Sequence, residues 1–329
     1  MRVLVLGGTS FLSKEVAGNA LRRGHEVVCA ARGRTGAAPD GARLVVVDRD
    51  EPGGVEVLAG EKFDAVVDVA TALGWVHDAL TVLVPGAGHW TFVSTINVYA
   101  DTATMRQTAG ADLLEPATTT DRLERADMTP EIYGGIKVAS ENVVRDATGD
   151  RAFLVRPGLI TGPGDYMDRF GYWPARFSRG GRVVVPDTPQ QPIQHIDVRD
   201  LAAWIVTAGE QRLTGAYDAV GPVLELGPML RDIAELVAAE GTELVPTSPD
   251  KLIAAAVNPW SGPRSLPLWL PRSHYGLASH DATSAWAAGL QCRPLSETVE
   301  AALADERARG LDRPRTAGLT AEEEIALLS

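Results

Sequence analysis

MRVLVLGGTSFLSKEV, residues 1–16, is the stretch that decides the fold. An apolar run ends in two glycines, and a helical pattern follows at 11–22. A strand that turns through glycines into a helix is typical of the phosphate-binding start of a dinucleotide-binding domain. The G-x-x-G-x-x-G spacing of such loops begins at Gly7, but its second and third positions hold Ser10 and Ser13. The stretch therefore predicts a nucleotide loop of unusual composition.

The two serines change the loop without removing its means of binding phosphate. Ser10 adds a Cβ where the backbone approaches the pyrophosphate, yet its hydroxyl can donate a hydrogen bond to that phosphate. Ser13 is among the smallest residues that can replace glycine where the helix packs on the strand. The amides and the dipole at the start of the helix still favour an anion. We expect adjusted binding; the alternative is a remnant loop that no longer binds.

Composition excludes several classes of function. The net charge of -12 argues against a nucleic-acid partner, because binding phosphate backbones needs clustered Lys and Arg. Cys29 and Cys292 are the only cysteines, too few for a disulfide framework or a metal cage, so we expect no metal. No run of about 18 apolar residues and no signal-peptide pattern occurs, which predicts a cytoplasmic protein without membrane contact.

The first half of the chain alternates short apolar runs with helical patterns, which is typical of a parallel sheet covered by helices. The runs are rich in Val and Leu without polar alternation, so we expect strands buried on both faces. The predicted strands cover residues 2–6, 25–30, 43–47, 64–69, 90–94 and 151–156. The predicted fold class is α/β, a Rossmann-type doubly wound parallel sheet with a smaller C-terminal substrate lobe.

Later segments return to this sheet. A strand pattern at 194–198 precedes a helix at 199–210, and 216–220 reads as one more strand of the main sheet. The polar segment at 100–131 has no clear period, and its length predicts a lid or binding loop. The predicted division is a dinucleotide-binding domain over 1–160, joined by 192–222, and a substrate lobe over 161–191 and 223–329.

The segment Tyr133-Gly-Gly-Ile-Lys137 carries the most chemistry. In a helix, positions i and i+4 place the Tyr and Lys side chains on one face. A phenol has a pKa of about 10, so proton transfer near pH 7 needs a shift of roughly three units, or about 4 kcal/mol. An adjacent ammonium group and a positively charged cofactor ring can supply such a shift.

Five pieces of the sequence together resemble the extended and atypical short-chain dehydrogenase/reductase family, which includes nucleotide-sugar epimerases and dehydratases. They occur in family order from residue 2 to about residue 220, and the last third of the chain is less specific. The pieces are the Gly7 loop, S-T-x-x-V-Y at 94–99, Y-G-x-x-K-x-x-x-E at 133–141, R-P-G-x-x-x-G-P-G at 156–164 and H-I-D-V-R-D-L-A at 195–202.

The resemblance implies roles for individual residues. Tyr133 would be the general acid/base, and Lys137 would hold the nicotinamide ribose and lower the phenol pKa. Thr95, rather than Ser94, would hydrogen-bond the reacting oxygen. The alternative is that Thr95 caps a strand end and Tyr133 packs on the sheet. The implied cofactor contacts are Gly7, Thr9, Ser10, Phe11, Leu12, Arg32, Arg34, Asp48, Arg49, Val69, Tyr133, Lys137 and Pro157.

The second strand indicates which dinucleotide binds. NAD sites usually end this strand with Asp or Glu, whereas here it leads into Arg32-Gly33-Arg34. Two guanidinium groups can engage a 2′-phosphate, so we favour NADP(H), with NAD(H) as the alternative if the arginines are solvated loop charges. Asp48 matches the family position that contacts the adenine amino group, although a helix-capping Asp would look the same.

The substrate side has weaker signals. The segment after Gly164 contains residues that could line a pocket for an anionic or aromatic substrate, or could equally pack in a core: Arg169, Tyr172, Trp173 and Arg176. Trp75 and His77 follow the fourth strand, where the nicotinamide end should lie. His195 precedes a helix and could reach the substrate or be structural.

These patterns predict an oxidoreductase that moves a hydride at a carbonyl, alcohol or imine carbon of a small molecule. Dehydratases of the family follow the Thr with an Asp-Glu pair, and Ile96-Asn97 stands there instead, which counts against dehydration. A sugar-nucleotide epimerase is the alternative reaction, and a non-catalytic dinucleotide sensor the alternative class. The protein is expected to be a monomer or a homodimer.

Overall fold

The centre of the molecule is a parallel sheet of seven strands in the order β11-β6-β5-β4-β1-β2-β3. The computed structural model describes residues 1–119, 122–123 and 127–329. The strands are β1 (Arg2–Leu6), β2 (Glu26–Ala31), β3 (Arg43–Val46), β4 (Ala65–Asp68), β5 (Trp90–Val93), β6 (Ala152–Pro157) and β11 (Gly215–Ala219). The strand order reverses between β1 and β4, and in such sheets ligands bind at the carboxyl ends of the strands beside that point.

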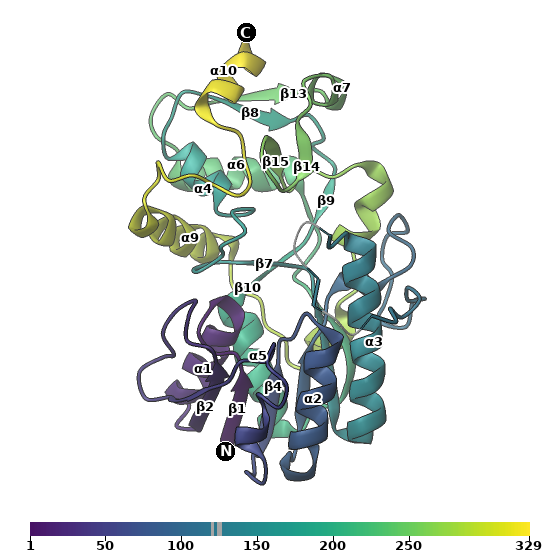
Figure 1. The fold of residues 1–329 in the computed structure, drawn as a ribbon. Helices are drawn as coiled ribbons and strands as arrows, with labels where there is room; N and C mark the ends of the chain where they lie inside the picture. The colour runs from purple at the N-terminus through teal and green to yellow at the C-terminus, as the bar shows by residue number, and fades with distance from the viewer. Residues whose placement is uncertain (120–121, 124–126) are drawn as a thin grey trace.

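Helices cover both faces of this sheet (Figure 1). On one face α1 (Phe11–Arg22) packs against α5 (Val198–Gln211), and on the other α2 (Leu73–Leu83) packs against α3 (Pro130–Thr148). The predicted doubly wound α/β sheet is confirmed. The predicted helix 11–22 coincides with α1, but α2 had no sequence prediction. Short helical turns connect these elements: η1 (Glu56–Leu58), η2 (Val84–Gly86), η3 (Ile96–Val98) and η4 (Gly149–Arg151).

A second lobe lies beyond the carboxyl ends of the strands, and the C-terminus is at its far end (Figure 1). Its sheets are small: β8 pairs with β13 and β14 with β15, both in parallel. Its helices are α4 (Tyr172–Phe177), α6 (Leu226–Val237), α7 (Pro249–Ala254), α9 (Leu295–Arg309) and α10 (Ala321–Leu328). The strands are β8 (Arg182–Pro186), β13 (Glu243–Thr247), β14 (Asn258–Trp260) and β15 (Ser265–Pro267).

Two short strand pairs join the halves. The elements are β7 (Leu159–Thr161) with β10 (His195–Asp197), and β9 (Pro192–Ile193) with β12 (Leu224–Glu225). The lobe has its own apolar core, centred on Phe170, Trp173 and Phe177. The predicted lobe span 223–329 also contains η5 (Arg272–Ala278) and α8 (Thr283–Ala287), where the chain returns toward the main sheet. Ala285 of α8 packs in the core of that sheet.

Across the described ranges, no helix combines the length and the apolar character needed to cross a bilayer. In the described part of the predicted lid segment 100–131, Leu113 forms a bridge with Tyr99, and the end of the segment enters α3. Residues 120–121 and 124–126 of that prediction lie outside the described residues.

Candidate active site

The glycine loop between β1 and α1 is held by two close approaches. Gly7 and Gly8 have φ values of 130° and 95°, which favour glycine. A Cβ on Gly8 would lie 2.8 Å from the Cβ of Cys29 in β2. A Cβ on Gly7 would lie 3.2 Å from the Cβ of Ser13, whose hydroxyl donates to the Ser10 carbonyl at 2.8 Å. Ser13 therefore fits at the packing position because Gly7 leaves room for it.

The start of α1 keeps its anion-binding groups. Ser10 is the N-cap residue, with extended backbone and no side-chain capping bond, so its hydroxyl is not committed to the helix. Phe11 has a left-handed φ of 39° and its ring meets Tyr166 of the lobe edge-on, with centroids 6.1 Å apart. A segment of the lobe thus lies against the helix start. Together with the helix dipole, the amides at the start of α1 favour an anion such as the pyrophosphate of a dinucleotide.

Two other predicted cofactor contacts lie on this loop or beside it: Thr9 on the loop, and Val69 directly after β4. Val69 Cγ2 is 3.5 Å from the position of a Gly7 Cβ, and the Thr9 hydroxyl is 3.3 Å from that of Thr35. Two further predicted contacts are buried: Leu12 in α1 and Pro157 at the end of β6.

The residues that follow β2 and β3 form a charged group. Arg32 Nη1 lies 3.2 Å from Asp50 Oδ2 and 3.9 Å from Asp48 Oδ1, and Arg34 Nη2 lies 3.9 Å from Asp48 Oδ2. Carboxylates are therefore present beside both arginines, although β2 itself ends without one. Asp50 is the residue that sequence reasoning missed. The pairing of β2 with β3 is the signal that brings the two strand ends together.

Trp75 lies in this same group. Its indole Nε1 donates to Asp50 Oδ1 at 3.2 Å, and the guanidinium carbons of Arg49 and Arg122 are each 5.5 Å from its ring centroid. Arg49 is held by the buried carboxylate of Asp68 at the end of β4, through bonds of 2.8 and 3.1 Å. The predicted substrate residue Trp75 thus contacts residues after β3, and its predicted neighbour His77 is exposed on α2.

Tyr133 and Lys137 occupy one face of α3. The Thr129 side chain caps this helix by accepting from the Ile132 amide, and Pro130 is its first residue. A Cβ on Gly134 would overlap the Asn97 carbonyl oxygen, so α3 packs directly on η3 at this point. The glycine after Tyr133 thereby brings the tyrosine to the end of β5.

Lys137 Nζ donates to the carbonyls of Ala70 and Val93, both at 2.6 Å, at the ends of β4 and β5. It lies 5.8 Å from the centroid of the Tyr133 ring. Burial lowers the pKa of Lys137 to about 8, while the negative charges of Asp68 and Glu141 oppose that shift. The ammonium group is thus fixed to the sheet edge and faces the tyrosine.

Burial raises the pKa of Tyr133 to about 12; Tyr166 adds to the shift and the positive charge of Arg169 opposes it. The resemblance implies a phenol pKa that Lys137 lowers. In this structure desolvation dominates, so the protein alone does not activate the phenol. Arg169 and Tyr166, from the segment after β7, act on it electrostatically from the lobe side.

Thr95 is the N-cap residue of η3, and its Oγ1 accepts from the Asn97 amide at 3.2 Å. The side chain is buried, with 8% of its surface exposed. This is the capping arrangement that we considered as the alternative. It leaves the hydroxyl proton free to be donated, because capping uses only an oxygen lone pair.

Three predicted substrate residues lie inside the lobe. Tyr172 and Trp173 are buried in its core, and the Trp173 indole donates to the Pro267 carbonyl at 3.0 Å. Arg176 Nε donates to Glu324 at 2.6 Å, and its other nitrogens donate to main-chain carbonyls. The structure brings these residues together with one another and not with Tyr133.

Arg169 and His195 lie nearer the strand ends. The Arg169 guanidinium carbon is 5.6 Å from the Trp260 ring centroid. His195 Nδ1 lies 3.2 Å from Thr161 Oγ1, and burial lowers the pKa of His195 to about 4. The imidazole is therefore neutral near pH 7. Among the side chains that the structure describes, no group of three or more His, Cys, Asp or Glu could hold a metal ion.

The family model "NAD dependent epimerase/dehydratase family" matches residues 3–219, which contain the glycine loop, Thr95, Tyr133 and Lys137. The chain belongs to this family. Membership indicates an NAD-dependent enzyme of the extended short-chain dehydrogenase/reductase kind. No curated protein matches the sequence.

Solved structures of similar fold include several enzymes of this family. The UDP-Glc/GlcNAc 4-epimerase of Campylobacter jejuni has a TM-score of 0.67 at 15% identity, over 93% of this chain and 99% of that one. WbmH of Bordetella bronchiseptica, solved with NAD+, has a TM-score of 0.64 at 18% identity, over 94% of this chain and 99% of that one. The UDP-glucose-4-epimerase of Stenotrophomonas maltophila, solved with bound NAD, has a TM-score of 0.63 at 19% identity, over 94% of this chain and 98% of that one. At such identities the likeness shows a shared fold.

Proposed function

We propose that the protein is an NADP(H)- or NAD(H)-dependent oxidoreductase that moves a hydride at a carbonyl, alcohol or imine carbon of a small molecule. The observation that carries the proposal is the contact of Gly134 with Asn97, which sets Tyr133 at the end of β5. Lys137 is fixed to the ends of β4 and β5, beside the strand-order reversal where ligands of such sheets bind.

The proton transfer falls to Tyr133. A bound nicotinamide supplies the hydride donor or acceptor. The phenol Oη donates its proton to, or removes one from, the substrate oxygen, and it needs positive charge nearby because burial raises its pKa to about 12. Lys137, 5.8 Å from the ring centroid, and Arg169 provide that charge. Thr95 donates its hydroxyl proton to the same oxygen and fixes the substrate's orientation.

The proposed dinucleotide is NADP(H). Arg32 and Arg34 lie on one loop, close enough to Asp48 that both guanidinium groups approach a single carboxylate. A 2′-phosphate would replace that carboxylate as their partner. Asp48 and Asp50 would in turn be available to ribose hydroxyls of NAD(H), which is why that cofactor is the alternative.

Titration of NADPH and NADH, followed by the fluorescence of the reduced nicotinamide, tests the preference. We expect NADPH to bind at least tenfold more tightly than NADH. Arg32→Ala and Arg34→Ala should each weaken NADPH binding by about tenfold, since a hydrogen bond to a charged group contributes about 1.5–3 kcal/mol. The control Arg307→Ala changes an exposed residue of α9 and should leave both affinities unchanged. Tighter NADH binding that neither loop variant alters would contradict the preference.

A sugar-nucleotide epimerase is the second candidate, supported by family membership and by the UDP-sugar 4-epimerases among the structures of similar fold. Isotope transfer separates the two reactions. With 4-deuterated NADPH or NADH and a panel of nucleotide sugars, ketones and cyclic imines, a net reductase puts deuterium into the product and consumes cofactor. Interconversion of two sugar nucleotides without net cofactor consumption would replace the reductase with the epimerase.

A further inference from the structure

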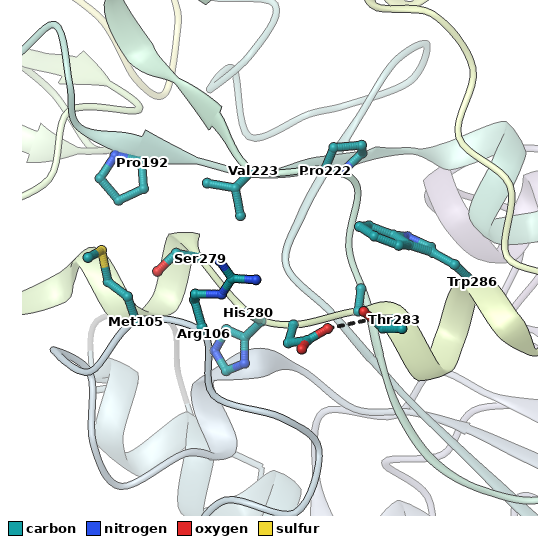
Figure 2. A pocket seen from close by; sticks show the side chains of 11 residues that line it. Met105, Arg106, Pro192, Pro222, Val223, Ser279, His280, Thr283 and Trp286 are labelled. Carbon is teal, nitrogen blue, oxygen red and sulfur yellow. Dashed lines mark hydrogen bonds between the residues drawn. The ribbon is translucent and has the colours of Figure 1, made fainter.

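A cavity of about 410 Å³ opens between two walls of the chain (Figure 2). One wall is the segment 279–286, together with Met105 and Arg106. The other wall is formed by Pro192, Pro222 and Val223. None of these residues belongs to the candidate active site. The volume lies in the range of small-molecule sites, about 300–1,000 Å³.

The lining of this cavity is mainly apolar. Met105, Val223 and Trp286 are 56%, 48% and 40% exposed, and all three line it. Large apolar side chains on a surface are common singly, but a group of them around one hollow marks a site of interaction. The Trp286 indole is fixed in place, because its Nε1 donates to the Val220 carbonyl at 3.2 Å.

A buried glutamine holds both walls together. The Gln194 amide nitrogen donates to the carbonyls of Gly221 and His280 at 2.8 and 2.9 Å. Its oxygen accepts from the His280 amide at 2.6 Å. The His280 ring packs against Tyr99 in a tilted arrangement, with centroids 4.6 Å apart, and its Nδ1 lies 3.2 Å from Asp218 Oδ2, which fixes the ring behind the wall. The cavity is therefore formed before any ligand arrives.

Arg106 places a positive charge at this apolar hollow. Its φ of 64° is left-handed, a conformation that costs of order 1 kcal/mol for a residue with a Cβ. Its amide donates to the Ser279 carbonyl at 2.7 Å, and the Asp281 amide donates to Gln107 at 2.8 Å, which together hold the turn. Figure 2 shows the side chain rising from the lower wall toward Val223. Among the described residues, no carboxylate lies within 4.0 Å of the guanidinium.

We propose that this cavity is a second ligand site, for a small amphipathic organic anion. Its aromatic or aliphatic body lies against Trp286, Val223 and Met105, and its carboxylate or sulfonate head pairs with Arg106. Asp281 carries the opposite charge at the same wall and weakens the attraction for the anion. Because the chain has a net charge of -12, most of it repels an anion. The pairing of the anionic head with Arg106 therefore determines where such a ligand binds.

Two fluorescent probes with the same apolar body test this charge-specific site. 1-Anilinonaphthalene-8-sulfonate carries the anionic head, and N-phenyl-1-naphthylamine lacks it. We expect Arg106→Gln to weaken sulfonate binding by about tenfold and to change binding of the neutral probe by less than twofold. Asp281→Asn, which keeps the acceptor for the Thr283 amide, should tighten sulfonate binding a few-fold.

Matched variants separate this site from nonspecific binding. Trp286→Ala should weaken binding of both probes, and Arg307→Gln, at an exposed residue of α9, should change neither. Thermal melting verifies that each variant is folded. Sulfonate affinity unchanged by both Arg106→Gln and Trp286→Ala would overturn the proposal. A concentration-dependent dimer in light scattering that Val223→Ser dissociates would also overturn it, since a second copy would then cover this surface.

Discussion

Helices α3 and α4 each carry a tyrosine followed four residues later by a basic residue, but the two pairs lie in different surroundings. Tyr133 and Lys137 lie four residues apart on α3, and Tyr172 and Arg176 lie four residues apart on α4. The first pair sits at the carboxyl ends of β4 and β5, where Lys137 is bound to two carbonyls. The second pair is in the lobe's interior, where Tyr172 is 2% exposed. A tyrosine one turn from a cation thus becomes a candidate catalytic pair only through its position relative to the sheet.

Glycine contacts set both positions. Gly134 allows α3 to lie on the Asn97 carbonyl, and a Cβ there would also approach Leu114 Cδ1 to 2.5 Å. Near α4, a Cβ on Gly318 would lie 2.5 Å from Tyr172 Cε2, so the chain closes over that ring. In one case the close approach brings the tyrosine to a strand end, and in the other it seals the tyrosine inside a core.

The contact at Gly134 gives the largest expected effect on stability. Gly134→Ala should lower the free energy of unfolding by about 3–4 kcal/mol, because the overlap involves backbone that cannot move without shifting η3. It should also abolish turnover by displacing Tyr133. In the control Gly110→Ala, the nearest atom lies 3.7 Å from the new Cβ, and urea unfolding should change by less than about 0.5 kcal/mol. Equal stability of the two variants would refute the close packing of α3.

The cations of the two pairs should differ in their dependence on pH. The pKa of Lys137 is about 8 in the folded protein, against an ordinary value of 10.5. Between these values the unfolded state holds more protons, so the free energy of unfolding rises with pH across that window. Relative to Lys137→Met, the free energy of unfolding of the wild type should rise by about 3 kcal/mol from pH 8 to 10.5.

Arg176→Met is the control for that titration, because arginine stays charged over this range. The Arg176→Met variant loses the ion pair with buried Glu324, so its free energy of unfolding should be about 3 kcal/mol lower than that of the wild type. This difference should stay the same from pH 8 to 10.5. Chemical unfolding at several pH values measures both. A flat difference between wild type and Lys137→Met would contradict the lowered lysine pKa.

The smallest effects separate the two serines of the glycine loop. Ser13→Ala removes the bond to the Ser10 carbonyl and should lower the free energy of unfolding by about 1 kcal/mol. Ser10→Ala should change stability by less than about 0.5 kcal/mol, since its hydroxyl makes no capping bond, yet should weaken dinucleotide binding several-fold. Unfolding and dinucleotide titration of both variants measure this. The reverse pattern would show that Ser10, not Ser13, is structural.

Much of the sheet could be predicted because its strands are buried on both faces and appear as continuous runs of Val and Leu. Helix α1 and strand β1 occupy the predicted residues. The lobe's sheets could not be predicted in the same way, since β8 and β13 are short and lie more than fifty residues apart in the sequence. Tyr172 and Trp173 are residue types that can line a pocket or pack in a core, and only the tertiary structure places them in a core.

The site was predictable where a local pattern carries the chemistry. Tyr133 and Lys137 follow from helical spacing and Gly7 from the turn. The partners of Arg32 required knowledge that β3 lies beside β2, which brings Asp48 and Asp50 to the same strand ends. The pKa of Tyr133 depends on burial and on Arg169 from the other lobe, and no spacing in the sequence encodes either.

The same substitution in both pairs tests the proton-transfer role of Tyr133. Tyr133→Phe and Tyr172→Phe each remove one hydroxyl. With a substrate found in the panel, we expect Tyr133→Phe to lower kcat by 10²–10⁴-fold with NADPH and NADH affinities within threefold of wild type. Tyr172→Phe should retain wild-type kcat. Full turnover in Tyr133→Phe would contradict proton transfer by this phenol.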